Sequence, residues 1–559
     1  MPTKSQQPAG GPGSGATAAR PAVPAGQNIP RRWLGLMVVC LGVMMAFVNV
    51  TGTISALTRI QDDLHISAAT LVWLTSAYSL AVVSLVMSAG TLSDLIGRRL
   101  TFILGSVVFT LGSLMAFVAD SPGTLIAAQA VMGLGGAAVL PSSLTIVTTT
   151  FTDPHERTTA ISAWAACSGL GLAAGPLIAG VLLEHFSWHS VYLTNLLIGA
   201  AAAALAPFFV HESKHPSRRL DLAGVVLGTV TLASATYAII QGGASGYTEP
   251  RIVVAYVVFA LSGALLVRVE LRHHDPMLDL RLFRNASFSA VMGVAAAAMF
   301  GFVGVALLTV LSMQRVQHLS TLGVGVRMLV LFGTFVAVSA VAPRLVRRFG
   351  FTVVLTSGLV AMGAGALALL AVGPFDGYEA VWPGLLVTGV GGGLLVAPSS
   401  AAAVSSVPPL QAGMAASAIN MARQLGNVLG PSVLGTIVTT HFPDNLHERL
   451  TGAGVPAADA RRIAEGAAHG SSGSGLPASL VHTVADAVPR AFTDAVHRGL
   501  LVAGVVVLLV AIPSALFVRH RLPAASAPVP TPGQDTASGG PSGSESGAGA
   551  AGGPTAGAR

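Results

Sequence analysis

The chain has 559 residues, of which 52% are hydrophobic and only 9% are charged. A soluble protein carries about 25% charged residues, so this composition excludes soluble folds and predicts an all-α polytopic membrane protein. The net charge of +7 calls for no nucleic-acid partner, because Lys and Arg retained in cytoplasmic loops account for such an excess. The two cysteines, Cys40 and Cys167, lie in apolar runs and suggest neither a disulfide framework nor a metal site.

The two ends of the chain differ in composition from its body. Residues 1–30 are rich in Pro, Gly, Ala, Ser and Gln, and residues 523–559 in Gly, Ser, Pro and Ala, so both are predicted to be disordered tails. Residues 1–30 lack the early apolar segment of a signal peptide. The first apolar run follows Arg31 and Arg32 and is expected to be retained as the first membrane span.

Fourteen apolar runs are long enough to cross a bilayer as helices, which takes ~20 residues. Lys and Arg concentrate in the short loops of one side, and the positive-inside rule places that side and both termini in the cytoplasm of a cell (plasma) membrane protein. A long polar loop, 441–496, is predicted to face outside, with a short helix at Ala457–Ile463. The predicted spans are 33–57, 70–89, 101–119, 124–147, 158–183, 189–210, 221–241, 251–269, 287–312, 322–342, 352–372, 380–404, 412–438 and 498–518.

The chain repeats itself weakly. The pattern Gly171-x3-Gly175-Pro176-x3-Gly180 recurs about 255 residues later as Gly426-x3-Gly430-Pro431-x3-Gly435. A Gly-x-Gly-Gly pattern and a Pro-Ser-Ser pattern recur at nearly the same offset. The repeat predicts two parallel six-helix halves, as in many transporters. The expected domains are an N-terminal half at 31–212, two inserted helices at 213–272 and a C-terminal half at 273–522.

A short charged turn separates the second and third spans. It reads Gly90-Thr-Leu-Ser-Asp94-Leu-Ile-Gly97-Arg98-Arg99-Leu100. Its glycines permit close helix approach and a turn that a side chain would hinder, and its arginines indicate the cytoplasmic side. Taken alone, such a turn could be an orientation signal and nothing more.

This turn resembles the signature loop between helices 2 and 3 of the major facilitator superfamily. The Gly171–Gly180 pattern is similar to the antiporter motif of drug exporters in that superfamily, with Ala179 where the motif usually has a glycine. Trp73-x3-Ala77-Tyr78, Trp188-x3-Tyr192-x2-Asn195 and Asn420-x2-Arg423-Gln424-x-Gly426 match other family positions. The resemblance covers about residues 33–518 and points to the fourteen-helix drug:proton antiporter branch.

The resemblance implies a secondary active transporter that exports amphipathic drugs, antibiotics or metabolites by alternating access, with protons as the candidate coupling ion. It implies no enzyme activity, no catalytic residues, no cofactor and no metal, and a functional monomer in the lipid bilayer. The loop residues Gly90, Asp94, Gly97, Arg98 and Arg99 would then control the conformational equilibrium. Three alternatives stay open at this level: an exchanger or facilitator of a metabolite or lipid without proton coupling, a non-transporting receptor on the same fold and, least favoured, a membrane enzyme.

Two positions depart from the family pattern. Asn49 stands where the family has an Asp at the end of span 1, and Gln129 where it has an Arg in span 4. Two amides can still hydrogen-bond each other, but neither can carry a proton. Proton coupling, if present, must then use another acid, and the remaining candidates are the span-end residues Glu184, Glu379, Asp94 and Asp221.

Arg423, in the middle of span 13, is the one charge predicted to lie deep in the membrane. An intramembrane charge is a candidate functional residue by default. We therefore expect Arg423, together with Asn49, Gln129 and Asn195, to line the substrate pathway or to take part in coupling.

Overall fold

The computed structural model describes residues 29–151, 153–213, 222–272, 280–407, 412–468 and 478–518. In these ranges the chain is helical and contains no strand. The helices are α1 (Ile29–Leu64), α2 (Ala68–Ile96), α3 (Arg98–Phe117), α4 (Pro122–Thr150), α5 (Pro154–His185), α6 (His189–Phe209), α7 (Leu222–Ser245), α8 (Pro250–Arg272), α9 (Ala286–Arg315), α10 (Thr321–Ala368), α11 (Tyr378–Ser405), α12 (Ala412–Gly452), α13 (Ala457–Ala468) and α14 (Ala478–Phe517), with short 3₁₀ turns η1 (Leu280–Arg284) and η2 (Leu369–Ala371).

Polar side chains begin several of these helices. Ser67 accepts a hydrogen bond from the backbone N–H of Thr70 at the start of α2, and Ser121 does the same for Thr124 in α4. Asn285 and Ser320 cap α9 and α10 in the same way. Such caps satisfy N–H groups that have no partner within the helix, which matters most where a helix end leaves the aqueous layer.

The predicted spans follow one another along these helices, and the fourteen-helix membrane fold is confirmed. Ten helices of the described ranges are long and apolar enough to cross a membrane by length and composition, and α2 and α7 contain shorter apolar stretches. The helix α10 combines two predicted spans. It bends at Gly350, whose φ of 81° breaks the helix. Gly350 lies 253 residues after Gly97, which also has a positive φ, of 116°, and this separation is close to the offset of the sequence repeat.

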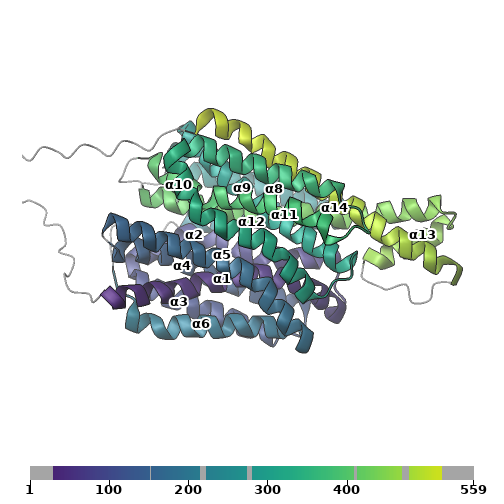
Figure 1. Cartoon of the computed structure of the whole chain (residues 1–559), viewed down its shortest axis with the longest axis horizontal. Helices are drawn as coiled ribbons and strands as arrows, with labels where there is room; N and C mark the ends of the chain where they lie inside the picture. Colours follow the sequence, from purple (N-terminus) through teal and green to yellow (C-terminus); the bar gives the residue numbers. More distant parts are fainter. Residues whose placement is uncertain are drawn as a thin grey trace, which may run out of the picture. The chain divides into compact units, whose positions relative to one another are not determined.

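Much of the region 441–496, predicted as a long polar loop, is helical. The helix α12 continues to Gly452, α13 follows, and α14 already begins at Ala478. The short helix expected at Ala457–Ile463 is confirmed as part of α13. The extensions of α12 and α14 are held together by Phe442 against Phe492, with ring centroids 5.3 Å apart, and lie together with α13 at one end of the bundle (Figure 1). Apolar residues interrupt the polar sequence often enough to bury a small core there.

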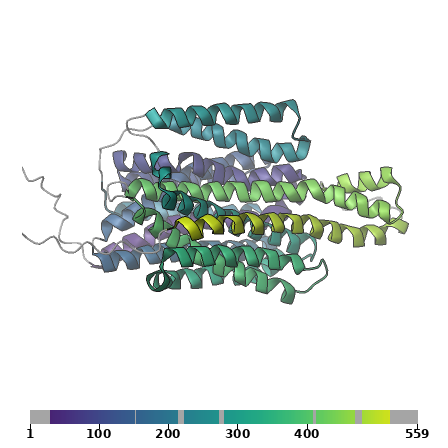
Figure 2. The same cartoon turned by 90° about the horizontal axis from the view of Figure 1, so that it is seen from above.

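The helices pack as two sets, α1–α6 and α9–α14. In the first set α1 lies against α5 and α6, and α3 against α4 and α6; in the second, α9 lies against α12 and α14, and α10 against α11. The inserted helices α7 and α8 pair with each other at one edge, where α7 contacts α2 and α12 (Figure 2). We call the end of the bundle that holds the α2–α3 turn the Gly97 end, and the opposite end the α13 end.

The glycine face of α5 lets three helices approach closely. A methyl group on Gly175 would overlap Oγ1 of Thr51 in α1, and one on Gly171 would meet the α1 backbone. One turn further, a methyl on Gly180 would lie 2.5 Å from Cα of Leu322 in α10. The antiporter-like motif therefore joins the two sets of helices, because only glycine leaves room for these approaches.

The corresponding face of α12 repeats this arrangement. Gly426 and Gly430 lie against the α9 backbone, where a methyl on Gly430 would come within 2.8 Å of the carbonyl oxygen of Phe300. Gly435 faces Val72 of α2, in the other set. Each glycine of the sequence repeat thus has an equivalent neighbour, which is the pattern expected of two pseudo-symmetric halves.

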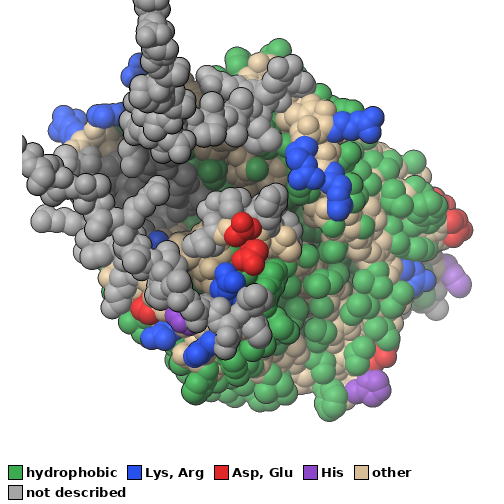
Figure 3. Space-filling view, turned by 60° about the vertical axis from the view of Figure 1, so that its left-hand side comes forward, with side chains coloured by type: hydrophobic (Ala, Val, Ile, Leu, Met, Phe, Trp, Pro, Cys, Tyr) green, Lys and Arg blue, Asp and Glu red, His purple; other side chains and the backbone are tan. Residues whose placement is uncertain are grey.

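Large apolar side chains cover the outside of the bundle. Leu104, Leu111, Leu197, Leu261 and Leu516 are each at least 48% exposed. Figure 3, which turns the Gly97 end toward the viewer, shows broad hydrophobic areas with Lys and Arg side chains at several places around them. Apolar patches of this extent are typical of surfaces in contact with lipid.

Candidate substrate pathway and coupling site

Three of the predicted pathway residues meet inside the first set of helices. Asn49 of α1 donates a hydrogen bond from Nδ2 to Oε1 of Gln129 in α4 over 3.1 Å. Asn195 of α6 donates from its Nδ2 to Oδ1 of Asn49, also over 3.1 Å. The three amides are no more than 1% exposed. The sequence indicated that Asn49 and Gln129 can hydrogen-bond each other, and this bond is observed. The contact of Asn195 with Asn49 was not predicted.

Two hydroxyl groups complete this amide network. Gln129 donates from Nε2 to Oγ1 of Thr53 over 3.0 Å and to the hydroxyl oxygen of Tyr192 over 3.2 Å. Sequence reasoning missed both roles, although helical spacing could have suggested them. Thr53 is four residues after Asn49, and Tyr192 three residues before Asn195, so each pair shares a helix face. Every side chain in the network is neutral at physiological pH.

The amide network borders a cavity with an empty volume of about 290 Å³ between the two sets of helices. Asn49, Thr53 and Gln129 line it from one side, and Asn427 and Pro431 of α12 from the other. Oδ1 of Asn195 and Oδ1 of Asn427 are buried and accept no hydrogen bond from the described residues. Of these two acceptors, Asn427 lines the cavity and could accept a hydrogen bond from a small molecule bound between the two halves.

Arg423 lies apart from the amide network. Its guanidinium group donates to Oγ of Ser399 over 3.1 Å and to Oδ1 of Asn420 over 3.4 Å. It also donates to the carbonyl oxygen of Val396 and to Oγ of Ser400. The Arg423 side chain is therefore directed neither toward the lipid nor toward the aqueous phase. It links α12 to α11 through hydrogen bonds to neutral acceptors. Its role in the substrate pathway stays a prediction.

The turn at the Gly97 end is held by an acid that sequence reasoning missed. Glu212, just after α6, accepts hydrogen bonds from the backbone N–H of Arg99 over 3.1 Å and of Leu100 over 3.2 Å. Arg98 donates to Oγ of Ser213 over 3.2 Å. A carboxylate at the first turn of α3 is stabilised by the unpaired N–H groups and the helix dipole. No periodicity links Glu212 to a turn more than a hundred residues earlier.

Some predicted coupling residues fall outside what the structure describes. The side chain of Asp94 is among these, and so is Asp221. Gly90 is part of α2. Glu184 and Glu379 are exposed at the α13 end. In the described ranges no group of three or more His, Cys, Asp or Glu side chains could hold a metal ion.

Hydrogen bonds between the two sets of helices lie toward the α13 end. Gln314 of α9 donates from Nε2 to the carbonyl oxygen of Ser55 in α1 over 3.0 Å and accepts a hydrogen bond from Thr58. Ser76 of α2 and Ser432 of α12 are joined over 2.9 Å. These contacts close the bundle at the α13 end, beyond the amide network.

Two pseudo-symmetric helical halves with a cavity between them are the arrangement of a membrane transporter of the alternating-access class. The model of the Major Facilitator Superfamily matches residues 39–431, and the chain belongs to this family. It is a transporter and not an enzyme.

Among curated proteins, the chain is 32% identical over 421 residues to the multidrug resistance protein Stp of Mycobacterium tuberculosis, covering 75% of this chain and 78% of that protein. It is 30% identical over 489 residues to the multidrug efflux pump LfrA of Mycolicibacterium smegmatis, covering 86% and 95%. The methylenomycin A resistance protein of Streptomyces coelicolor is 30% identical over 420 residues, covering 74% and 88%.

Solved structures share the fold. A bacterial homologue of the human lysosomal transporter Spinster, in an inward-facing and unoccupied conformation, superposes with a TM-score of 0.57 at 15% identity, covering 89% of this chain and 100% of that one. An auto-inhibited peptide transporter of the POT family gives a TM-score of 0.59 at 13% identity, covering 89% and 99%.

Proposed function

We propose that this transporter exports amphipathic drugs, antibiotics or metabolites by alternating access, as a functional monomer. The observation that carries the proposal is the buried amide network of Asn49, Gln129 and Asn195, which borders a cavity shared by both halves. The names of the relatives Stp and LfrA, a multidrug resistance protein and an efflux pump, support the same direction and substrate class.

The orientation follows from charge. We place the Gly97 end in the cytoplasm, since Arg98 and Arg99 lie there, and short loops rich in Lys and Arg stay inside. Both termini are then cytoplasmic, and α13 is outside. The hydrogen bonds of Gln314 with Ser55 and Thr58 would close the outer side, as expected of an inward-open state.

Transport then requires the halves, 31–212 and 273–522, to rock about the amide network, with 213–272 as a peripheral insertion. The α5 glycine face that contacts both α1 and α10 is a suitable pivot, because its close packing has few alternative arrangements. The turn held by Glu212 would bias the equilibrium between inward-open and outward-open states.

A second candidate is an exchanger or facilitator without proton coupling. The specific observation in its favour is that the amide network contains no carboxylate and no basic side chain, where the family resemblance implies an Asp and an Arg. A proton carrier must change its charge between the two sides of the membrane, and an amide cannot. Coupling, if it exists, runs through an acid outside this network.

Everted membrane vesicles that contain the chain test both proposals. Uptake of a fluorescent amphipathic dye is measured with an imposed pH gradient, acidic inside, and again after a protonophore. Gradient-driven, protonophore-sensitive uptake supports a proton-coupled exporter, and uptake independent of the gradient supports the exchanger. Asn195→Leu, which keeps the side-chain size but removes the donor to Asn49, should reduce uptake in either case. Vesicles with no more uptake than those lacking the chain would contradict transport altogether.

A further inference from the structure

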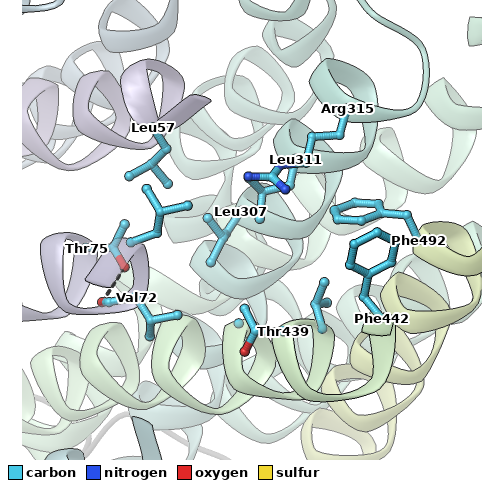
Figure 4. Close-up of a pocket in the computed structure, with 12 residues that line it drawn as sticks. Leu57, Val72, Thr75, Leu307, Leu311, Arg315, Thr439, Phe442 and Phe492 are labelled. Atoms are coloured by element: carbon cyan, nitrogen blue, oxygen red, sulfur yellow. Dashed lines mark hydrogen bonds between the residues drawn. The ribbon is translucent and has the colours of Figure 1, made fainter. Parts of the chain in front are cut away.

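A larger cavity lies near the α13 end, beyond the amide network. Its empty volume is about 560 Å³, and it is lined by α1 and α2 on one side and by α9, α12 and α14 on the other. Leu57, Leu307, Phe442 and Phe492 form apolar parts of its wall, and Figure 4 shows the two rings side by side.

One charged side chain enters this apolar cavity. Arg315, at the end of α9, directs its guanidinium group among Leu307, Leu311 and the rings (Figure 4). Its central carbon lies 5.8 Å from the ring centroid of Phe492. Arg315 makes no hydrogen bond or ion pair with any described residue, and its Nε is buried without a partner.

Three other arginines of the described ranges donate to protein acceptors, although Nε of Arg423 is also buried without a partner. Arg423 donates to several acceptors of α11, and Arg449 pairs with Asp494 over 2.6 Å. Arg327, also at the α13 end and also beside a ring, donates to the carbonyl oxygen of Gly323 over 3.1 Å. Asp62 acts on Arg315 electrostatically but is exposed and forms no ion pair with it.

The buried Nε of Arg315 has lost its hydration without gaining a hydrogen-bond partner, which is costly in an apolar pocket. An oxyanion would supply the missing acceptors, since carboxylate, sulfonate and phosphate groups match the planar fork of Arg with two parallel hydrogen bonds. The surrounding leucines and phenylalanines would at the same time bury an apolar body.

We propose that this cavity binds an amphipathic organic anion, with its charged group on Arg315 and its apolar part against Phe442 and Phe492. The site gives the exporter a preference for anionic compounds at its outer side. This proposal rests on the proposed function for the claim that the bound anion is a substrate, whereas binding itself can be tested without transport.

The test uses the full-length protein in phosphatidylcholine nanodiscs and two probes that differ only in charge, 4-(1-pyrenyl)butyrate and 4-(1-pyrenyl)butanol. Binding is followed by energy transfer from tryptophan to pyrene, after subtraction of the signal from empty nanodiscs. The variants are Arg315→Gln, Arg315→Lys and the matched control Arg327→Gln. Leu311→Trp fills the cavity and leaves Arg315 in place.

The wild type should bind the carboxylate roughly tenfold to a hundredfold more tightly than the alcohol, as expected for a hydrogen-bonded ion pair in an apolar site. Arg315→Gln should abolish this preference, Arg315→Lys should keep part of it, and Arg327→Gln should keep all of it. Leu311→Trp should weaken both probes. Equal affinity of the wild type for both probes, or an unchanged preference in Arg315→Gln, overturns the proposal.

Two further experiments distinguish an organic anion from a membrane lipid, and binding from transport. If phosphatidylglycerol added to the nanodiscs displaces the carboxylate at equimolar amounts, the occupant is a membrane lipid and the proposal is wrong. The dye-uptake assay is then repeated with Arg315→Gln. If Arg315→Gln loses the preference for the carboxylate but still transports the dye, the exporter function stands. If the wild type binds the carboxylate but transports nothing, only the exporter function is contradicted.

Discussion

Asn49 and Gln129 share a hydrogen bond of 3.1 Å inside the N-terminal half, at the two positions where the family resemblance of the sequence implies an acid and a base. A buried ion pair is stable only while both partners are present. Replacement of both by amides keeps the contact between α1 and α4 and removes the charge. The hydrogen bond thus joins two side chains that cannot themselves carry a proton.

The first prediction concerns this pair. Asn49→Asp alone should destabilise the protein by roughly 3 kcal/mol, because it places a carboxylate among neutral groups. Asn49→Asp with Gln129→Arg should recover most of that loss by restoring an ion pair. The measurement is thermal unfolding in detergent of both single variants and the double variant. Additive effects of the two substitutions would show that the residues do not interact.

The double variant also tests whether the amide pair limits proton coupling. If it does, protonophore-sensitive dye uptake should appear or increase in Asn49→Asp/Gln129→Arg relative to the wild type. Unchanged uptake in a stable double variant would mean that coupling depends on another site.

The second prediction concerns Arg423. Arg423→Ala should lower stability by about 1.5–3 kcal/mol, because the hydrogen bonds from its charged group to α11 are lost. Arg423→Lys should be intermediate, since a point charge cannot replace the planar fork. Thermal unfolding and dye uptake per folded molecule are compared with Arg327→Ala, a cation nearer the α13 end. Normal stability with an altered substrate range would instead assign Arg423 to the pathway.

The third prediction concerns the α2–α3 turn. Gly97 has φ 116°, and a methyl group there would lie 2.5 Å from Oε1 of Glu212. Gly97→Ala should therefore reduce transport and cost about 1–2 kcal/mol of stability. Glu212→Gln should reduce transport with a smaller loss of stability, since it weakens the cap of α3. Gly123→Ala, where the added methyl meets open space, is the control.

The combined variant Gly97→Ala/Glu212→Ala separates the backbone strain of the positive φ from the clash of the added methyl group with Glu212. Removal of the carboxylate relieves the clash but not the positive φ, so only part of the stability should return. Wild-type transport in Gly97→Ala would show that this turn has no influence on the conformational equilibrium.

The fourth prediction concerns closure at the α13 end. Gln314→Ala removes the hydrogen bond to Ser55 and the acceptor of Thr58, so it should shift the equilibrium toward opening at that end. A single cysteine at Leu311, with Cys40 and Cys167 replaced by alanine, should then react faster with an impermeant thiol reagent added outside. Gln317→Ala, which loses only a contact with Asp376 in the same half, serves as the control. Equal labelling rates in the two variants would contradict this closure.

Much about this protein was determined by sequence alone. Composition and the length of the apolar runs dictate a helical membrane bundle, because the bilayer excludes unpaired backbone groups. The recurrence of Gly171–Gly180 at Gly426–Gly435 revealed two halves, since close helix contacts demand small residues at fixed spacing. The sequence also indicated that the side-chain amides of Asn49 and Gln129 can hydrogen-bond each other, because each amide has both a donor and an acceptor.

The tertiary structure decided which distant side chains share a site. Asn195 joins the amide network, Glu212 caps α3, and Arg315 enters an apolar cavity, although nothing in the local pattern links these residues to their neighbours. Such contacts depend on how helices rotate and cross when they pack, a property of the whole bundle. For the same reason Arg423 looked like an isolated charge in sequence, and only the packing of α11 against α12 supplies its acceptors.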